Sequence, residues 1–304
     1  KRKTDAENPR MDPLMRALKA LHSAGSPEAM TPEELEHQRR NQEILGRLTA
    51  PMAGMEYEEL SIGTMPAAWT RLKTPHGDRR VILYCHGGGY TSGNLGYSRV
   101  LSSKLAHVTG YDVLSFEYRL APEFPYPAAV EDALRTWDYL MLQGYGARDI
   151  VLAGDSAGGN LALVLCHRLK AAGRRLPGAL VLMSPWTDMT MSGASYAERA
   201  ESDPMLTPEY IEAVRTAYAG GRDYASPDLS PLFADLTGFP PTLIQAGDHE
   251  ILYSDAEMLC HALERAGVPC RFEVSEGMWH VFQMFPLRKA AAAMESVARF
   301  LLER

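Results

Sequence analysis

From about residue 55 onward, short apolar runs alternate with longer stretches of helical periodicity, and this alternation constrains the fold more than any other feature. Short Val/Ile/Leu-rich runs are typical of buried strands, and the stretches between them are long enough for crossover helices. We therefore expect an α/β fold with a mostly parallel sheet and helices on both faces. The expected strands are Glu56–Ile62, Ala67–Lys73, Val81–Cys85, Asp112–Tyr118, Ile150–Ala153, Ala179–Met183, Thr242–Ala246 and Arg271–Val274; the expected helices are Val100–Val108, Ala128–Leu142, Ala157–Ala172, Ser254–Ala266 and Leu287–Leu302.

Two segments fall outside this alternation. Residues 1–54 carry two helical patterns, Pro13–Ala24 and a second that begins with the capping box Thr31-Pro32-Glu33-Glu34 and continues to about Leu48. From about residue 187 to 238 there is no strand pattern, but Thr207-Pro208-Glu209 begins another helical run. We expect residues 55–304 to form one α/β domain, with residues 1–54 and the insertion at about 187–238 forming a helical cap.

Composition and charge weigh against several classes of partner. Of the 304 residues, 31 are Lys or Arg and 38 are Asp or Glu, and the resulting charge of −7 weighs against nucleic acid or an anionic membrane as the main partner. No apolar run approaches the ~18 residues that a membrane span needs, and the first residues have no apolar stretch typical of a signal peptide, so we expect a cytoplasmic protein. The four cysteines lie at unrelated spacings in apolar segments, which predicts buried free thiols rather than disulfides or a zinc site.

The sequence Gly154-Asp155-Ser156-Ala157-Gly158-Gly159 lies directly between an expected strand and an expected helix. In a GxSxG sequence the Ser occupies a sharp, strained turn, and the glycines two residues away leave room for it. The turn lifts the hydroxyl clear of the sheet, and the N-terminus of the following helix favours negative charge beside it. This context predicts that Ser156 is a nucleophile, with a Gly-rich structural turn as the alternative.

A second glycine-rich segment, His86-Gly87-Gly88-Gly89, follows the expected strand Val81–Cys85. Consecutive glycines let backbone N–H groups approach a substrate oxygen without interference from side chains. A flexible turn and a phosphate-binding loop are the alternatives, but no Lys-Ser or Lys-Thr follows the glycines as a P-loop requires. We assign the oxyanion donors to the N–H groups of Gly88, Gly89 and Ala157.

A serine nucleophile needs a histidine base, which follows it in the chain when the order is Ser, acid, His. Of the nine histidines, His280 comes after the strand Arg271–Val274, where a loop at the carboxyl edge of the sheet can reach Ser156. His249 is a rival, but its position beside acidic residues is more typical of a surface histidine. We therefore expect His280 to be the base.

The acid that orients this base is less well defined by the residues alone. Three carboxylates follow the strand Thr242–Ala246 directly: Asp248, Glu250 and Asp255. They therefore lie at the carboxyl end of a strand, where the acid of such a site is expected. Local sequence leaves the choice between Asp248 and Glu250 open.

With these residues, the chain resembles the hormone-sensitive-lipase-like group of α/β-hydrolases, the bacterial family IV carboxylesterases. The resemblance implies an eight-stranded sheet with only the second strand antiparallel, and a cap made of the N-terminal helices and the insertion after the sixth strand. It rests on the motifs His86-Gly87-Gly88-Gly89-Tyr90, Tyr118-Arg119-Leu120-Ala121-Pro122-Glu123, Pro125-Tyr126-Pro127-Ala128-Ala129, Gly154-Asp155-Ser156-Ala157-Gly158-Gly159 and Ser202-Asp203-Pro204-Met205.

The resemblance also bears on the acid. In many members of the family, the acid is the Asp of an Asp-Pro-Leu segment about 30 residues before the catalytic His; the counterpart here is Glu250-Ile251-Leu252, and 280 − 250 = 30. The family pattern thus favours Glu250 over Asp248, although the residue type departs from it. A second departure is His280-Val281-Phe282, where many relatives have His-Gly-Phe.

The activity that the resemblance implies is hydrolysis of short- to medium-chain carboxylic esters through an acyl-enzyme, without a metal or organic cofactor. The expected partner is a small-molecule ester, with no nucleic acid and no membrane span, and a homodimer is compatible with the resemblance. Cleavage of amides, as in deacetylases and formamidases, and ligand binding without catalysis are the alternatives; the presence of His280 argues against the second. Apolar cap residues either line the substrate pocket or form only the core of the cap: Met30, Met52, Met205, Leu206 and Tyr210.

Overall fold

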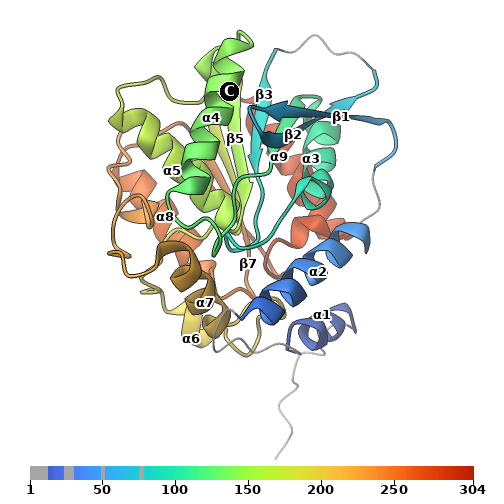
Figure 1. Cartoon of the computed structure of the whole chain (residues 1–304), viewed down its shortest axis with the longest axis vertical. Helices are drawn as coiled ribbons and strands as arrows, with labels where there is room; N and C mark the ends of the chain where they lie inside the picture. Colours follow the sequence, from blue (N-terminus) through green and yellow to red (C-terminus); the bar gives the residue numbers. More distant parts are fainter. Residues whose placement is uncertain (1–12, 24–30, 49–51, 75–78) are drawn as a thin grey trace, which may run out of the picture.

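A single eight-stranded sheet forms the centre of the computed structural model, which describes residues 13–23, 31–48, 52–74 and 79–304 (Figure 1). The strand order is β1-β2-β4-β3-β5-β6-β7-β8; β2 is antiparallel to both of its neighbours, and the other pairs are parallel. The predicted fold class, a mostly parallel sheet with the second strand reversed, is confirmed. The strands are β1 Met55–Ile62, β2 Met65–Leu72, β3 Val81–Cys85, β4 Asp112–Phe116, β5 Ile150–Asp155, β6 Ala179–Met183, β7 Thr242–Gly247 and β8 Cys270–Ser275.

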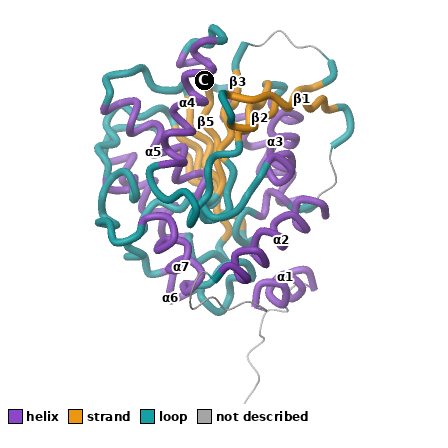
Figure 2. The backbone as a smooth tube through the Cα atoms, in the orientation of Figure 1, coloured by secondary structure: helices purple, strands orange, loops and turns teal. Residues whose placement is uncertain are grey.

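Helices cover both faces of the sheet, which explains why the central strands are apolar without alternation (Figure 2). Side chains of β3 alternate between two cores: Leu83 belongs to the core that includes residues of α4, α5 and α8, while Ile82 and Tyr84 belong to the core that includes residues of α3 and α9. The helices on the first face are α4 Ala128–Leu142, α5 Ala157–Ala171 and α8 Tyr253–Arg265; those on the second are α3 Leu95–Thr109 and α9 Arg288–Leu302.

The α3 helix begins at Leu95 rather than at the expected Val100, because Asn94 caps it. The Asn94 side chain accepts the Tyr97 N–H at 2.9 Å and satisfies one of the free donors of the first turn. The described residues also form three short 3₁₀ turns, of which the second lies between β6 and β7: η1 Ala147–Asp149, η2 Pro231–Phe233 and η3 Phe282–Met284.

The helices outside the alternation gather at one end of the molecule, the lower end in Figure 1. They are α1 Pro13–Ser23, α2 Pro32–Leu48, α6 Ser195–Glu198 and α7 Pro208–Ala219. The predicted capping box is present, because Thr31 Oγ1 accepts the Glu34 N–H and the Glu34 carboxylate accepts the Thr31 N–H. Lys19 on α1 donates to the Glu201 carbonyl between α6 and α7, so α1 contacts the insertion. Among the described helices, none has the length and apolar character of a membrane span.

All four cysteines are free thiols, as predicted, but only three are buried. Cys270 is half-buried, because it lies on β8, the last strand of the sheet, whose residues are mostly half-exposed. The prediction of burial is therefore wrong for Cys270.

Candidate active site

Ser156 lies at the junction of β5 and α5 in a backbone conformation that L-residues rarely adopt, with φ 53° and ψ −121°. Two glycines make this turn sterically feasible. A Cβ at Gly158 would lie 2.0 Å from the carbonyl oxygen of Cys85, and one at Gly154 would lie 2.3 Å from the carbonyl oxygen of Gly158. The backbone segments at this turn are so close that side chains at these two positions are excluded, as the sequence motif predicts.

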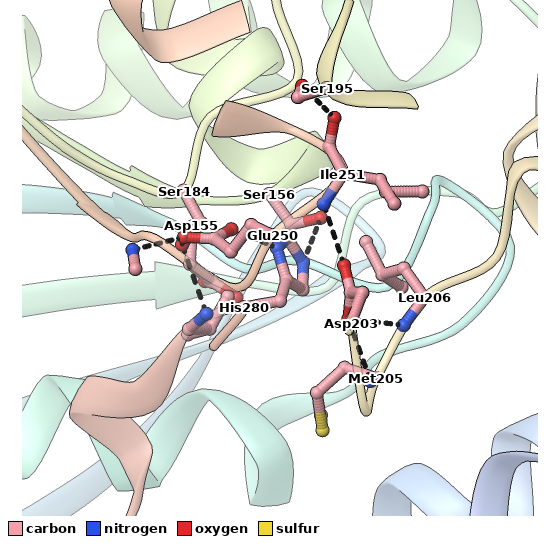
Figure 3. A network of polar contacts seen from close by, with 12 residues as sticks. Asp155, Ser156, Ser184, Ser195, Asp203, Met205, Leu206, Glu250, Ile251 and His280 are labelled. Atoms are coloured by element: carbon pink, nitrogen blue, oxygen red, sulfur yellow. Dashed lines mark hydrogen bonds and ion pairs between the residues drawn. The ribbon is translucent and has the colours of Figure 1, made fainter. Parts of the chain in front are cut away.

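A continuous chain of hydrogen bonds runs from this serine into the interior (Figure 3). Ser156 Oγ lies 2.9 Å from His280 Nε2, and His280 Nδ1 lies 2.9 Å from Glu250 Oε1. The other carboxylate oxygen of Glu250 accepts hydrogen bonds from the Ser184 hydroxyl, at 2.9 Å, and from the Gly247 N–H. Glu250 is fully buried, so its carboxylate is held on both oxygens away from solvent.

The other two carboxylates considered from the sequence point elsewhere. Asp248 Oδ1 accepts hydrogen bonds from the Gly277 N–H and from a ring nitrogen of His249, both at 2.7 Å. Asp255 is buried, and its Oδ2 accepts two backbone N–H groups at the start of the insertion. Of the three carboxylates, the structure brings Glu250 to the imidazole of the expected base. Within the described residues, no group of three or more His, Cys, Asp or Glu side chains is arranged to hold a metal ion.

The glycine-rich loop after β3 is fixed against the serine turn. Gly88 and Gly89 have φ 121° and 62°, and a Cβ at Gly88 would lie 2.3 Å from a backbone oxygen of the same loop. The Gly87 N–H donates to Asp155 Oδ1 at 3.0 Å, which ties the loop to the residue before the serine. Ala157 is fully buried as the first residue of α5. The oxyanion roles of Gly88, Gly89 and Ala157 stay a prediction.

Burial shapes the electrostatics around this loop. Burial raises the pKa of Asp155, and hydrogen bonds from Tyr84, Tyr97 and the Gly87 N–H oppose the rise. Burial also lowers the pKa of His86 to about 4, so this imidazole is neutral near pH 7. Its Nδ1 lies 2.7 Å from the Gly87 carbonyl oxygen and must carry the proton, because a carbonyl only accepts. His86 therefore supports the loop as a neutral donor.

Sequence reasoning did not identify Ser184, which lies beside Glu250. Its hydroxyl donates to Glu250 and accepts the Val281 N–H at 3.0 Å, and so links Glu250 to the residue after His280. Val281 has φ 50°, a conformation that favours glycine, at the position where the resemblance to the family leads us to expect Gly. The available signal was the position of Ser184, a polar residue immediately after the apolar strand β6, at the sheet edge that carries the other site residues.

The insertion reaches the glycine-rich loop. A Cβ at Gly89 would lie 2.7 Å from the Tyr210 hydroxyl and 2.9 Å from Val214 Cγ1, both on α7. The residues expected to line a pocket or the cap core are half-buried where they are described: Met52, Met205, Leu206 and Tyr210. Met30 lies outside the described residues.

Comparison with known proteins gives a consistent result. A family described as the alpha/beta hydrolase fold matches residues 82–284. The chain is 39% identical over 264 residues to an acetyl-hydrolase of Streptomyces hygroscopicus, covering 86% of each chain, and 38% identical over 224 residues to an esterase of Acinetobacter venetianus, covering 73% of this chain and 74% of that one. A crystal structure of an esterase from the bacterial hormone-sensitive lipase family superposes with a TM-score of 0.89 at 36% identity, over 98% of this chain and 99% of that chain.

Proposed function

The chain belongs to the α/β-hydrolase fold family, among the bacterial hormone-sensitive-lipase esterases, and is a carboxylic ester hydrolase; on that premise we propose that Ser156, His280 and Glu250 are its nucleophile, base and acid. The observation that carries this proposal is the hydrogen-bond chain from Ser156 Oγ through His280 to Glu250, with 2.9 Å at each step. The strained turn at Ser156 and the burial of the Glu250 carboxylate support the same assignment.

In the proposed mechanism, Ser156 Oγ attacks the ester carbonyl carbon while His280 Nε2 takes its proton. The buried carboxylate of Glu250 accepts the Nδ1–H bond and stabilises the imidazolium that forms. The tetrahedral intermediate then collapses, the C–O bond to the alcohol breaks, and His280 protonates the departing oxygen. A water molecule that His280 deprotonates attacks the acyl-enzyme, and the acid leaves as Ser156 regains its proton.

The negative charge of the intermediate forms beside the glycine-rich loop and the start of α5. We assign its stabilisation to the N–H groups of Gly88, Gly89 and Ala157, since one such donor typically contributes about 2.7–4 kcal/mol to the transition state. The N-terminal end of the α5 dipole favours the same charge.

The proposed substrates are esters of short- to medium-chain acids, bound between the sheet and a cap formed by residues 1–54 and about 187–238. The contact of α7 with the glycine-rich loop supports this location, because Tyr210 and Val214 lie against Gly89. A series of p-nitrophenyl esters of increasing acyl length tests the proposed chain length. The value of kcat/KM should be highest for the short and medium acyl chains, and a maximum for long-chain esters would contradict the proposal.

The decisive experiment replaces the nucleophile. We expect Ser156→Ala to abolish hydrolysis of p-nitrophenyl acetate while the circular dichroism spectrum and melting temperature stay close to wild type. A fluorophosphonate probe should form its adduct on Ser156, as mapped by mass spectrometry. An adduct on another residue, or activity above about a tenth of wild type in the variant, would overturn the assignment, because loss of a triad nucleophile typically costs far more than tenfold.

A further inference from the structure

The loop that carries Glu250 is held by side chains of the insertion (Figure 3). Ile251 follows Glu250 directly and is fully buried. Its N–H donates to Asp203 Oδ2 at 2.8 Å, and its carbonyl oxygen accepts the Ser195 hydroxyl at 2.5 Å. Both polar backbone groups of Ile251 are therefore bound by side chains that lie between β6 and β7 in the sequence.

Asp203 uses both oxygens of its carboxylate. Oδ2 accepts the Ile251 N–H of the loop that carries Glu250, which we call the acid loop. Oδ1 accepts the N–H groups of Met205, at 2.8 Å, and Leu206, at 2.9 Å. Burial raises the pKa of Asp203 to about 6, and the nearby His280 imidazole together with the three N–H donors opposes that rise. The carboxylate thus lies within electrostatic range of the base and joins the acid loop to the turn before α7.

Ser195 provides the second connection. Its hydroxyl accepts the Ser254 N–H at 2.9 Å while it donates to Ile251, and its own N–H donates to Ser254 Oγ at 3.0 Å. The approach of the two segments is close, because a Cβ at Gly193 would lie 2.3 Å from Ser254 Cβ. The insertion is therefore hydrogen-bonded to the start of α8 as well as to the acid loop.

We propose that Asp203 and Ser195 are positioning residues for catalysis: they fix the backbone of Ile251 and thereby set the distance from Glu250 to His280. The inference rests on the proposed function, because it presupposes that Glu250 is the acid. A displacement of about 1 Å in a catalytic constellation can cost roughly 100-fold in rate, so a backbone held by two hydrogen bonds has a kinetic consequence. The insertion then sets the geometry of the reacting groups as well as covering the site.

The first test compares Asp203→Asn with a matched control, Asp188→Asn. An Asn at 203 has one acceptor oxygen. The turn before α7 offers it two N–H donors and Ile251 offers one, so we expect the oxygen to face the turn and the amide NH₂ to face the Ile251 N–H. Asp188 is also a buried carboxylate of the insertion, but it binds Thr190 and Ser192 of its own loop.

At pH 8, where the Asp203 carboxylate is ionised, we expect Asp203→Asn to lower kcat for p-nitrophenyl acetate by roughly 10- to 100-fold. KM should change by less than about threefold, since the substitution does not alter the contacts that bind substrate equally in the ground state and the transition state. The Asp188 control should keep kcat within about twofold of wild type, because it tests burial of an amide in the insertion without disturbing Ile251. An unchanged kcat for Asp203→Asn, or an equal fall in both variants, would overturn the proposal.

The second test is a double-mutant cycle with Glu250→Gln. If Asp203 acts through Glu250, adding Asp203→Asn to Glu250→Gln should lower kcat by less than about twofold more. If the two losses multiply, Asp203 acts independently and the positioning proposal fails. Glu250→Gln alone tests the proposed function, so a high kcat in that single variant identifies a wrong acid rather than a wrong positioning residue.

Ser195→Ala keeps the proposal testable if Asp203→Asn does not fold. It removes one small hydroxyl and leaves the Asp203 bonds intact. We expect kcat to fall about fivefold or more, the equivalent of one lost hydrogen bond, and to change by less than about twofold when the variant is combined with Glu250→Gln. A wild-type kcat in a folded Ser195→Ala protein would contradict the proposal.

Discussion

Replacing Glu250 by Gln preserves the size of the side chain but leaves one acceptor oxygen where the wild type has two. Oε2 accepts the Gly247 N–H, which can only donate, while Oε1 faces His280 Nδ1. If the amide NH₂ faced Gly247, two donors would meet in a buried site at a cost of about 1–3 kcal/mol. We therefore expect the amide oxygen to face Gly247 and the NH₂ to face the imidazole.

In that orientation the amide donates to His280 Nδ1, and the ring proton moves to Nε2. An Nε2 that carries a proton cannot accept one from Ser156, so the base is lost although every atom is close to its wild-type position. A histidine in the wrong tautomer costs about 10⁴-fold in kcat in serine hydrolases with this arrangement. This corresponds to about 5.5 kcal/mol of activation free energy.

The assay is hydrolysis of p-nitrophenyl acetate at pH 8 under saturating substrate, with circular dichroism to verify folding. Asp248→Asn is the matched control: Asp248 is partly exposed and binds Gly277 and His249, so we expect its kcat to stay within about threefold of wild type, as for substitutions outside the buried network. The reasoning is refuted if Glu250→Gln keeps more than about a tenth of the wild-type kcat, or if Asp248→Asn loses more than Glu250→Gln.

The same structure makes three further predictions. Gly89→Ala should lower both kcat/KM and the melting temperature, because its Cβ would lie 2.7 Å from the Tyr210 hydroxyl at φ 62°, a conformation that costs an L-residue about 1–2 kcal/mol; adding Tyr210→Phe should restore part of the loss, and no difference between the single and double variants would contradict this contact. Ser184→Ala should lower the free energy of unfolding by about 1–3 kcal/mol, measured by urea titration, because it leaves the buried Val281 N–H without its acceptor, and kcat should fall as well; a wild-type value for both would contradict it. Burial raises the pKa of Asp255 to about 8, far above the value of about 3.9 in an unfolded chain, so the folded state holds this proton more tightly and the free energy of unfolding should fall as the pH rises from about 4 through 8; melting temperatures between pH 6 and 9 should fall less steeply for Asp255→Asn, and parallel slopes would refute the assignment.

The sequence predicts the fold closely, because buried parallel strands and crossover helices leave strong apolar patterns. All eight strands lie where the short apolar runs are, and α4 has the bounds expected for it. The resemblance to the hormone-sensitive-lipase-like esterases is confirmed by the family match and by the similar structures. Helix starts were less predictable, since the early start of α3 depends on the conformation of Asn94, which periodicity does not reveal.

The site was only partly predictable. Edge position alone could not separate Asp248 from Glu250, because both follow β7 and the distinction depends on which side chain turns inward. The spacing to His280 favoured the residue that the structure places against the imidazole, while its catalytic role stays a prediction. Ser184 and Asp203 bind backbone groups of other loops. The position of Ser184 after β6 indicates the sheet edge, but the groups that the two side chains contact depend on the three-dimensional path of the chain.

The order of β5, β6, β7 and β8 in the sheet follows the order of the chain, and the proposed reacting groups are spread along this half of it. The bond between Ser156 and His280 joins residues 124 positions apart, and the strands β6, β7 and β8 lie between them in the chain. Closing so long a loop is slow compared with forming helices, because the chain entropy is lost before the contact stabilises anything. During refolding, esterase activity should therefore return after the helical signal, so that the enzyme's own turnover marks the completion of its sheet.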